Sequence, residues 1–78
     1  MSNYELAKSI AAFSYDVNPY AFNDEFDTFD DGVDQIAQLL ESEPETVTGA
    51  LESMFAESED QRERMECASL VRLVRAHV

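Results

Sequence analysis

The stretch that decides the fold is residues 36–55, which read IAQLLESEPETVTGALESMF. Its apolar side chains recur every three or four residues on both sides of Ser42, which is the spacing of two amphipathic helices. Ser42 with Glu45 has the S-x-x-E pattern of a capping box, and Pro44 is tolerated in the first turn of a helix. The stretch therefore predicts two helices joined by a turn of three or four residues, with the second helix capped by Ser42.

The apolar spacing within residues 33–55 is carried by Ile36, Ala37, Leu40, Thr46, Val47, Ala50 and Leu51. This set is similar to the helix-turn-helix core of many bacterial transcription regulators, in which a small residue packs at the helix crossing and a valine anchors the second helix. Glu41 departs from that pattern because it replaces the usual turn glycine, and Gly49 departs because it lies inside the second helix.

The exposed positions expected on the second helix of this pair carry no basic side chain. They are Glu45, Thr48, Glu52 and Ser53. Affinity for DNA depends largely on Lys and Arg side chains that neutralise phosphates, and base recognition depends on donors that reach the groove edges. We therefore expect no direct binding of nucleic acid by this pair.

Capping patterns on either side predict the remaining helices. The first expected helix runs from Asn3 to about Tyr15 and is capped by Ser2 with Glu5, and a short helix or ordered loop follows over Pro19–Phe26. Thr28 with Asp31 opens the next helix. The last helix is capped by Ser58 with Gln61 and supported by an ion pair between Asp60 and Arg64. No segment alternates as a strand does. The sequence predicts an all-α fold, a small bundle of four to five short helices in a single domain over residues 1–78.

The side chains expected to face the core follow the same helical spacing. They are Leu6, Ala7, Ile10, Ala11 and Phe13 in the first helix, Val33, Ile36, Ala37, Leu39 and Leu40 before Ser42, Val47, Ala50, Leu51, Met54 and Phe55 after it, and Cys67, Val71, Val74 and Val78 in the last helix.

The charge of the chain is strongly negative and unevenly distributed. The formal net charge is −12, and no Lys or Arg occurs between Ser9 and Gln61, whereas all four arginines follow Gln61. Such a field opposes approach to nucleic acid or to an anionic membrane and favours cationic partners. No apolar run is long enough to span a bilayer, and the first residues do not resemble a signal peptide, so we expect a cytoplasmic protein.

The residues needed for common metal sites and catalytic sites are not arranged in recognisable patterns. If Gly32 is aligned with the sixth position of an EF-hand loop, Phe29 falls at the third position and Gln38 at the twelfth, where oxygen ligands are required. A single Cys and a single His, Cys67 and His77, cannot form a four-ligand zinc site. No phosphate loop or nucleophile motif occurs. We expect neither an enzyme nor a cofactor.

Closely spaced carboxylates are the most distinctive feature that remains, and residues 23–34 (NDEFDTFDDGVD) contain the densest group. Carboxylates one helical turn apart lie roughly 5–6 Å apart and can present a row of negative charge to a groove that receives nucleic acid. The residues expected to bind a partner are Asp24, Glu25, Asp27, Asp30, Asp31 and Asp34, with Glu41, Glu43, Glu45 and Glu52 as a second patch.

In length, charge and lack of catalytic motifs, the chain resembles the small phage-encoded DNA mimics, which include anti-CRISPR and anti-restriction proteins. The resemblance is one of overall character. It implies a non-enzymatic inhibitor whose acidic surface blocks a cationic nucleic-acid-binding site, such as that of a CRISPR effector complex or a restriction enzyme. The protein would act in the host cell cytoplasm if it is phage-encoded.

Two other interpretations fit the same composition. A haloadapted helix-turn-helix regulator would use the carboxylates for general solvation and would bind DNA. An acidic adaptor or antitoxin would cover a basic protein partner, with aromatic anchors at Tyr20, Phe22, Phe26 and Phe29, unless these side chains form the core. A homodimer through Val71, Val74 and Val78 is a further possibility.

Overall fold

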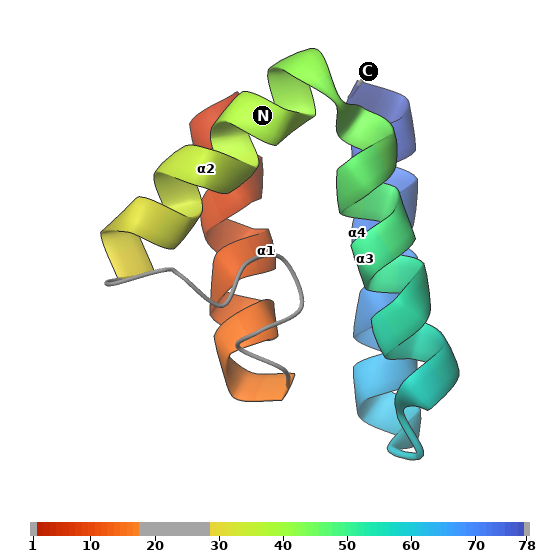
Figure 1. The fold of residues 1–78 in the computed structure, drawn as a ribbon. Helices are drawn as coiled ribbons and strands as arrows, with labels where there is room; N and C mark the ends of the chain where they lie inside the picture. Colours follow the sequence, from red (N-terminus) through yellow and green to blue (C-terminus); the bar gives the residue numbers. More distant parts are fainter. Residues whose placement is uncertain (1, 18–28, 78) are drawn as a thin grey trace.

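The computed structural model describes residues 2–17 and 29–77, and this part of the chain is all-α, as predicted (Figure 1). The expected element over Pro19–Phe26 and the cap at Thr28 lie outside the described residues. The structure contains the helices α1 (Asn3–Val17), α2 (Phe29–Ser42), α3 (Pro44–Glu57) and α4 (Gln61–His77).

The four helices form two packed pairs. α3 and α4 run antiparallel as a helical hairpin, and α2 crosses α1 beside it (Figure 1). The start of α1 lies next to the end of α4, where the side chain of Asn3 contacts the ring of His77. The bundle thus brings together residues from both ends of the described chain.

α1 begins as its capping pattern predicts. Ser2 Oγ accepts a hydrogen bond from the Glu5 amide at 3.1 Å, which satisfies one of the amide groups that have no partner at a helix N-terminus. The helix continues to Val17, two residues beyond the predicted end.

The junction between α2 and α3 differs from the prediction. The capping box of Ser42 with Glu45 is wrong, because Ser42 is still helical and its hydroxyl donates to the Gln38 carbonyl at 2.9 Å. Glu43 is the N-cap residue, and no side-chain hydrogen bond caps α3. Pro44 explains the position of the break, since its ring disfavours helical geometry in the preceding residue, and Glu43 has φ −142° and ψ 66°.

The helix-turn-helix-like pair is not confirmed. Glu43 is the single non-helical residue between α2 and α3, whereas the expected turn has three or four residues. Each helix of this pair packs mainly against a different neighbour, α2 against α1 and α3 against α4.

The start of α4 also differs in its details. Asp60, rather than Ser58, caps the helix, and its Oδ1 accepts from the amides of Arg62 and Glu63 at 2.8 and 3.2 Å. The predicted ion pair between Asp60 and Arg64 is wrong as well. The Arg64 guanidinium instead donates to the carbonyls of Phe55 and Ser58, both at 3.2 Å, and lies 4.2 Å from the centroid of the Phe55 ring. Arg64 therefore ties the beginning of α4 to the end of α3.

The core is a single cluster of buried side chains from all four helices. Nearly every position expected to face inward is buried or half-buried, and Leu70 joins the cluster although the sequence did not single it out. Ser14 is also buried, and its Oγ has no hydrogen-bond partner among the described residues. Val71 and Val74 belong to this core and expose little surface, although each lines a hollow between α3 and α4. The homodimer through them stays a prediction, and Val78 lies outside the described residues.

Gly49 provides a direct test of helix stability. It is exposed in the interior of α3, and a Cβ built there meets no atom within 4 Å. We expect Gly49→Ala to raise the free energy of unfolding by about 0.5–1 kcal/mol, because glycine loses more backbone entropy in a helix than alanine does. Urea unfolding followed by circular dichroism measures the change. Ser53→Ala, at another exposed position of α3, should stabilise less, and a larger gain there than at Gly49 would contradict the explanation.

Candidate functional site: an acidic surface on α2 and α3

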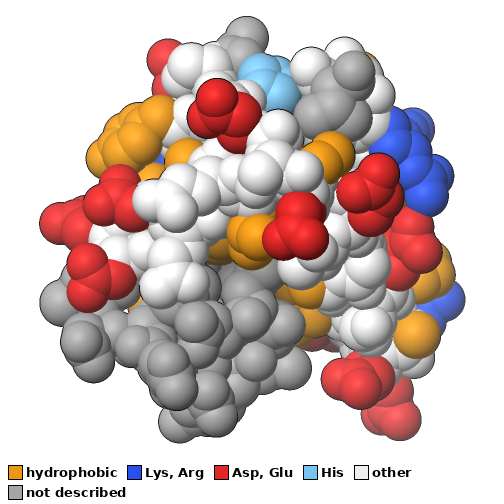
Figure 2. Space-filling view, turned by 45° about the horizontal axis from the view of Figure 1, so that its top comes forward, with side chains coloured by type: hydrophobic (Ala, Val, Ile, Leu, Met, Phe, Trp, Pro, Cys, Tyr) orange, Lys and Arg blue, Asp and Glu red, His pale blue; other side chains and the backbone are white. Residues whose placement is uncertain are grey.

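Seven of the carboxylates expected to bind a partner belong to the described residues, and all seven are exposed. They are Asp30, Asp31, Asp34, Glu41, Glu43, Glu45 and Glu52. Asp24, Glu25 and Asp27 lie outside the described residues. Figure 2 shows separate acidic side chains distributed over one face of the molecule, with the largest group of basic side chains at one edge.

Three of these carboxylates form a row along α2, which we call the α2 acidic ridge: Asp30, Asp34 and Glu41. Their separations of four and seven residues place them on one side of the helix, at axial distances of roughly 6 and 10 Å. The side of α2 about a third of a turn around the helix from the ridge is buried through Val33 and Ile36. Because core packing fixes the rotation of α2, the ridge is held toward solvent.

The ridge carboxylates form no salt bridge with any of the described residues. The described residues include every Lys and Arg of the chain, and the one salt bridge formed by these side chains joins Arg75 to Glu52. The ridge therefore presents carboxylates that no described Lys or Arg neutralises.

Glu52 differs from the other predicted site residues. Its Oε1 lies 2.7 Å from Arg75 Nη2, and the side chains of Glu52 and Arg75 are 55% and 66% exposed, respectively. The sequence analysis missed this ion pair because its members are far apart in the chain and belong to different helices. Glu52 is already partly neutralised, so it contributes less to an acidic surface than the ridge does.

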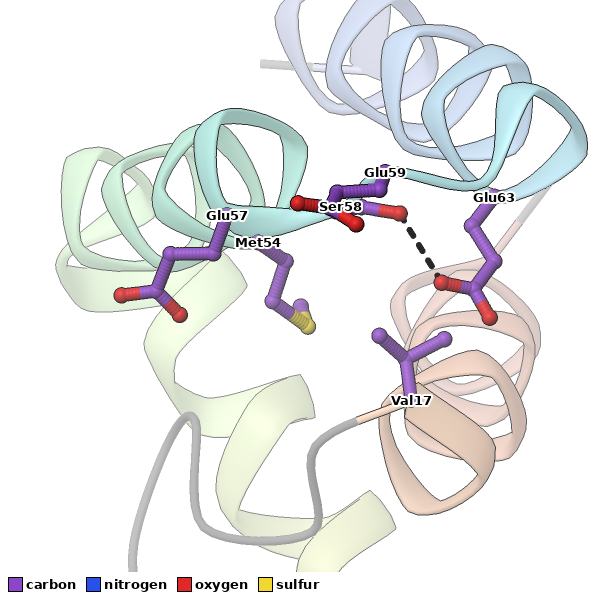
Figure 3. Close-up of a pocket in the computed structure, with 6 residues that line it drawn as sticks. All are labelled: Val17, Met54, Glu57, Ser58, Glu59 and Glu63. Carbon is purple, nitrogen blue, oxygen red and sulfur yellow. Dashed lines mark hydrogen bonds between the residues drawn. The ribbon is translucent and has the colours of Figure 1, made fainter.

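A second acidic feature lies at the α3–α4 turn, away from the predicted residues (Figure 3). A hollow of about 390 Å³ is lined there by Val17, Met54, Glu57, Ser58, Glu59 and Glu63. The Ser58 hydroxyl donates to Glu63 Oε1 at 2.9 Å, and this bond holds one carboxylate at the rim. The run of acidic residues from Glu57 to Asp60 was the available signal in the sequence.

The two side chains with potential reactivity are the Cys67 thiol and the His77 imidazole, and both lie on α4. The Cys67 thiol is buried, and this burial, together with the charges of Glu63 and Glu66, raises its pKa, so the thiol is protonated at neutral pH. His77 contacts Asn3 at the junction of α1 and α4.

Within residues 2–17 and 29–77, no three His, Cys, Asp or Glu side chains gather as metal ligands. None of the described helices has the length and apolar character needed to cross a membrane.

Comparison with models of protein families, with curated proteins and with solved structures finds no match to this chain. The functional argument therefore rests on the acidic surface itself.

Proposed function

We propose that this protein is a non-enzymatic inhibitor or interaction protein whose acidic surface covers a cationic, nucleic-acid-binding site on another protein. The observation that supports the proposal most directly is the α2 acidic ridge, whose carboxylates Asp30, Asp34 and Glu41 are exposed and form no salt bridge with the described part of the chain. A CRISPR effector complex or a restriction enzyme in the cytoplasm of a host cell is the type of target that this proposal implies.

The physical basis is the replacement of phosphate charges. A groove that receives nucleic acid is lined with Lys and Arg, and most of its affinity is electrostatic and independent of base sequence. A rigid row of carboxylates offers that groove a similar line of charge and would exclude nucleic acid by occupying the same place. Complementary fields also speed the encounter of the two proteins.

A second candidate is an acidic adaptor that covers a basic protein unrelated to nucleic acid. Phe29 favours it, because this side chain is 37% exposed beside Asp30 and contacts the ring of Tyr15 at a centroid distance of 5.5 Å. An aromatic side chain among charged rim residues is a common form of interface anchor. The two candidates differ in whether nucleic acid competes with the protein for its partner.

The test compares two variants that lose the same number of charges. In the first, the ridge is neutralised by Asp30→Asn, Asp34→Asn and Glu41→Gln. In the matched control, three exposed carboxylates elsewhere are neutralised by Glu57→Gln, Glu59→Gln and Glu66→Gln. Tagged proteins are used to capture partners from a lysate of the host cells, with and without added duplex DNA, across a salt series.

We expect the unmodified protein and the control to capture one basic complex that duplex DNA displaces, and the ridge variant to bind it at least about tenfold more weakly. Capture that DNA does not displace would favour the adaptor. Equal losses in both variants would show that total charge, rather than the ridge, determines binding, and would overturn the proposed site.

A further inference from the structure

A groove runs along the seam between α3 and α4 and is independent of the α2 acidic ridge. Its first hollow, of about 290 Å³, is lined by Glu52, Phe55, Ala68, Val71, Arg72 and Arg75. A second hollow of about 260 Å³ is lined by Pro44, Glu45, Thr48, Val74 and Arg75. Because Arg75 lines both hollows, they follow one another along the same seam, which we call the seam groove.

The first hollow of the seam groove combines apolar and cationic side chains. Phe55, Ala68 and Val71 supply apolar surface, and Phe55 is held in place by the Arg64 guanidinium above its ring. Arg72 and Arg75 are exposed and lie about one helical turn apart on α4. Arg72 forms no salt bridge with the described residues. The first hollow thus carries two cations against the single anion Glu52, on a protein that is otherwise strongly acidic, whereas Glu45 balances Arg75 in the second hollow.

Glu52 is the acidic side chain in the first hollow, and it reaches across from α3 to Arg75 on α4. An exposed ion pair of this kind contributes little to stability, because both groups are well solvated when they separate. A carboxylate from outside could therefore take the place of Glu52 on Arg75 at small cost.

We propose that the seam groove binds an acidic amphipathic helix of a partner protein. Apolar side chains of that helix would pack on Phe55, Ala68 and Val71, and its carboxylates would bind Arg72 and Arg75. A seam between two antiparallel helices accepts a third helix by packing of ridges into grooves, and helix-in-groove recognition uses such apolar anchors. The α2 ridge and the first hollow of the seam groove would then be two separate binding surfaces of opposite charge.

Charge complementarity favours this occupant over a second copy of the chain. Another copy would offer the ridge carboxylates, but Ala37 and Gln38 between Asp34 and Glu41 provide no large apolar side chain, and the exposed Phe29 at the start of α2 lies against the Tyr15 ring. Two seam grooves facing each other would bring their arginines together. Repulsion by the distant α2 carboxylates is reduced at physiological salt, where the screening length is about 8 Å.

The test uses a synthetic helical peptide with leucines at i, i+3 and i+7 and glutamates on the flanking positions. It is titrated into the isotope-labelled, full-length protein at physiological salt, and binding is followed by NMR chemical shifts. We expect the largest shifts at Phe55, Ala68 and Val71, and weaker binding of a peptide in which glutamine replaces each glutamate. No shift in the groove, or equal binding of both peptides, would overturn the proposal.

Three variants make the result specific. Arg72→Gln should weaken peptide binding about tenfold, whereas Arg62→Gln, the same change at an exposed position outside both hollows, should leave it unchanged. Glu52→Gln should strengthen binding about threefold, because it removes the competitor for Arg75. Equal effects of Arg72→Gln and Arg62→Gln, or weaker binding after Glu52→Gln, would overturn the proposal.

These outcomes do not depend on the proposed function. The ridge variant should bind the peptide at least as well as the unmodified protein, because it retains the seam groove and is less negative. If instead the groove resonances shift with the concentration of the protein alone, and the peptide causes no further shift, a second copy occupies the groove and the proposal is wrong.

Discussion

Leu51→Ala is expected to lower the free energy of unfolding by about 2–5 kcal/mol. Leu51 is fully buried in α3 and belongs to the cluster to which all four helices contribute. The loss has two parts, because the substitution removes apolar atoms from the core and leaves a cavity that the surrounding helices fill only partly. A domain of this size has a total stability of roughly 4–12 kcal/mol, so the substitution should remove a large part of it.

The measurement is urea unfolding followed by circular dichroism, and Leu73→Ala is the matched control. Leu73 has the same side chain on α4 but is 42% exposed, so its substitution should change the stability by less than about 0.5 kcal/mol. Similar losses for the two variants would show that the α3 core is not packed as described.

Arg64→Met is expected to lower the free energy of unfolding by about 1–2 kcal/mol. Methionine keeps much of the aliphatic stem but removes the donors to the Phe55 and Ser58 carbonyls and the cation above the Phe55 ring. These carbonyls lie at the C-terminal end of α3, where a helix has acceptors without intrahelical partners. The substitution should therefore loosen the turn between α3 and α4.

Thermal or urea unfolding of Arg64→Met and Arg62→Met separates the local contacts from the change in net charge. Arg62 is exposed and begins the same helix, so its loss removes the same charge without these contacts. Arg64→Lys should fall between the two, because an ammonium keeps the charge but lacks the planar fork of the guanidinium. A loss after Arg62→Met as large as that after Arg64→Met would contradict the role of the contacts.

Helical periodicity predicted the all-α fold and most of the core. Leu6, Ile10 and Ile36 are buried as expected, because one face of each helix must leave water and its spacing is visible in the sequence. The helix boundaries were less predictable. Ser42 has the residue type of an N-cap, but the ring of Pro44 shifts the break to Glu43.

Local rules failed where the choice of partner depended on the tertiary structure. Asp60 and Arg64 have the spacing of a helical ion pair, yet the carboxylate binds backbone amides and the guanidinium binds carbonyls of the preceding segment. The Glu52–Arg75 pair and the seam groove depend on the contact between α3 and α4, which no short sequence pattern specifies. The exposure of the acidic residues was predictable, because carboxylates are seldom buried without a partner.

The burial of Cys67 has a practical consequence for labelling. Since the chain has one cysteine and its thiol is both buried and protonated at neutral pH, a new cysteine at a surface position would be the preferred site for a maleimide dye or a photo-crosslinker. Gln38→Cys would place such a reporter on α2 beside the ridge, and Ser69→Cys would place one on α4, while the native Cys67 stays in place. Each reporter would then record which side of the molecule an unknown partner approaches.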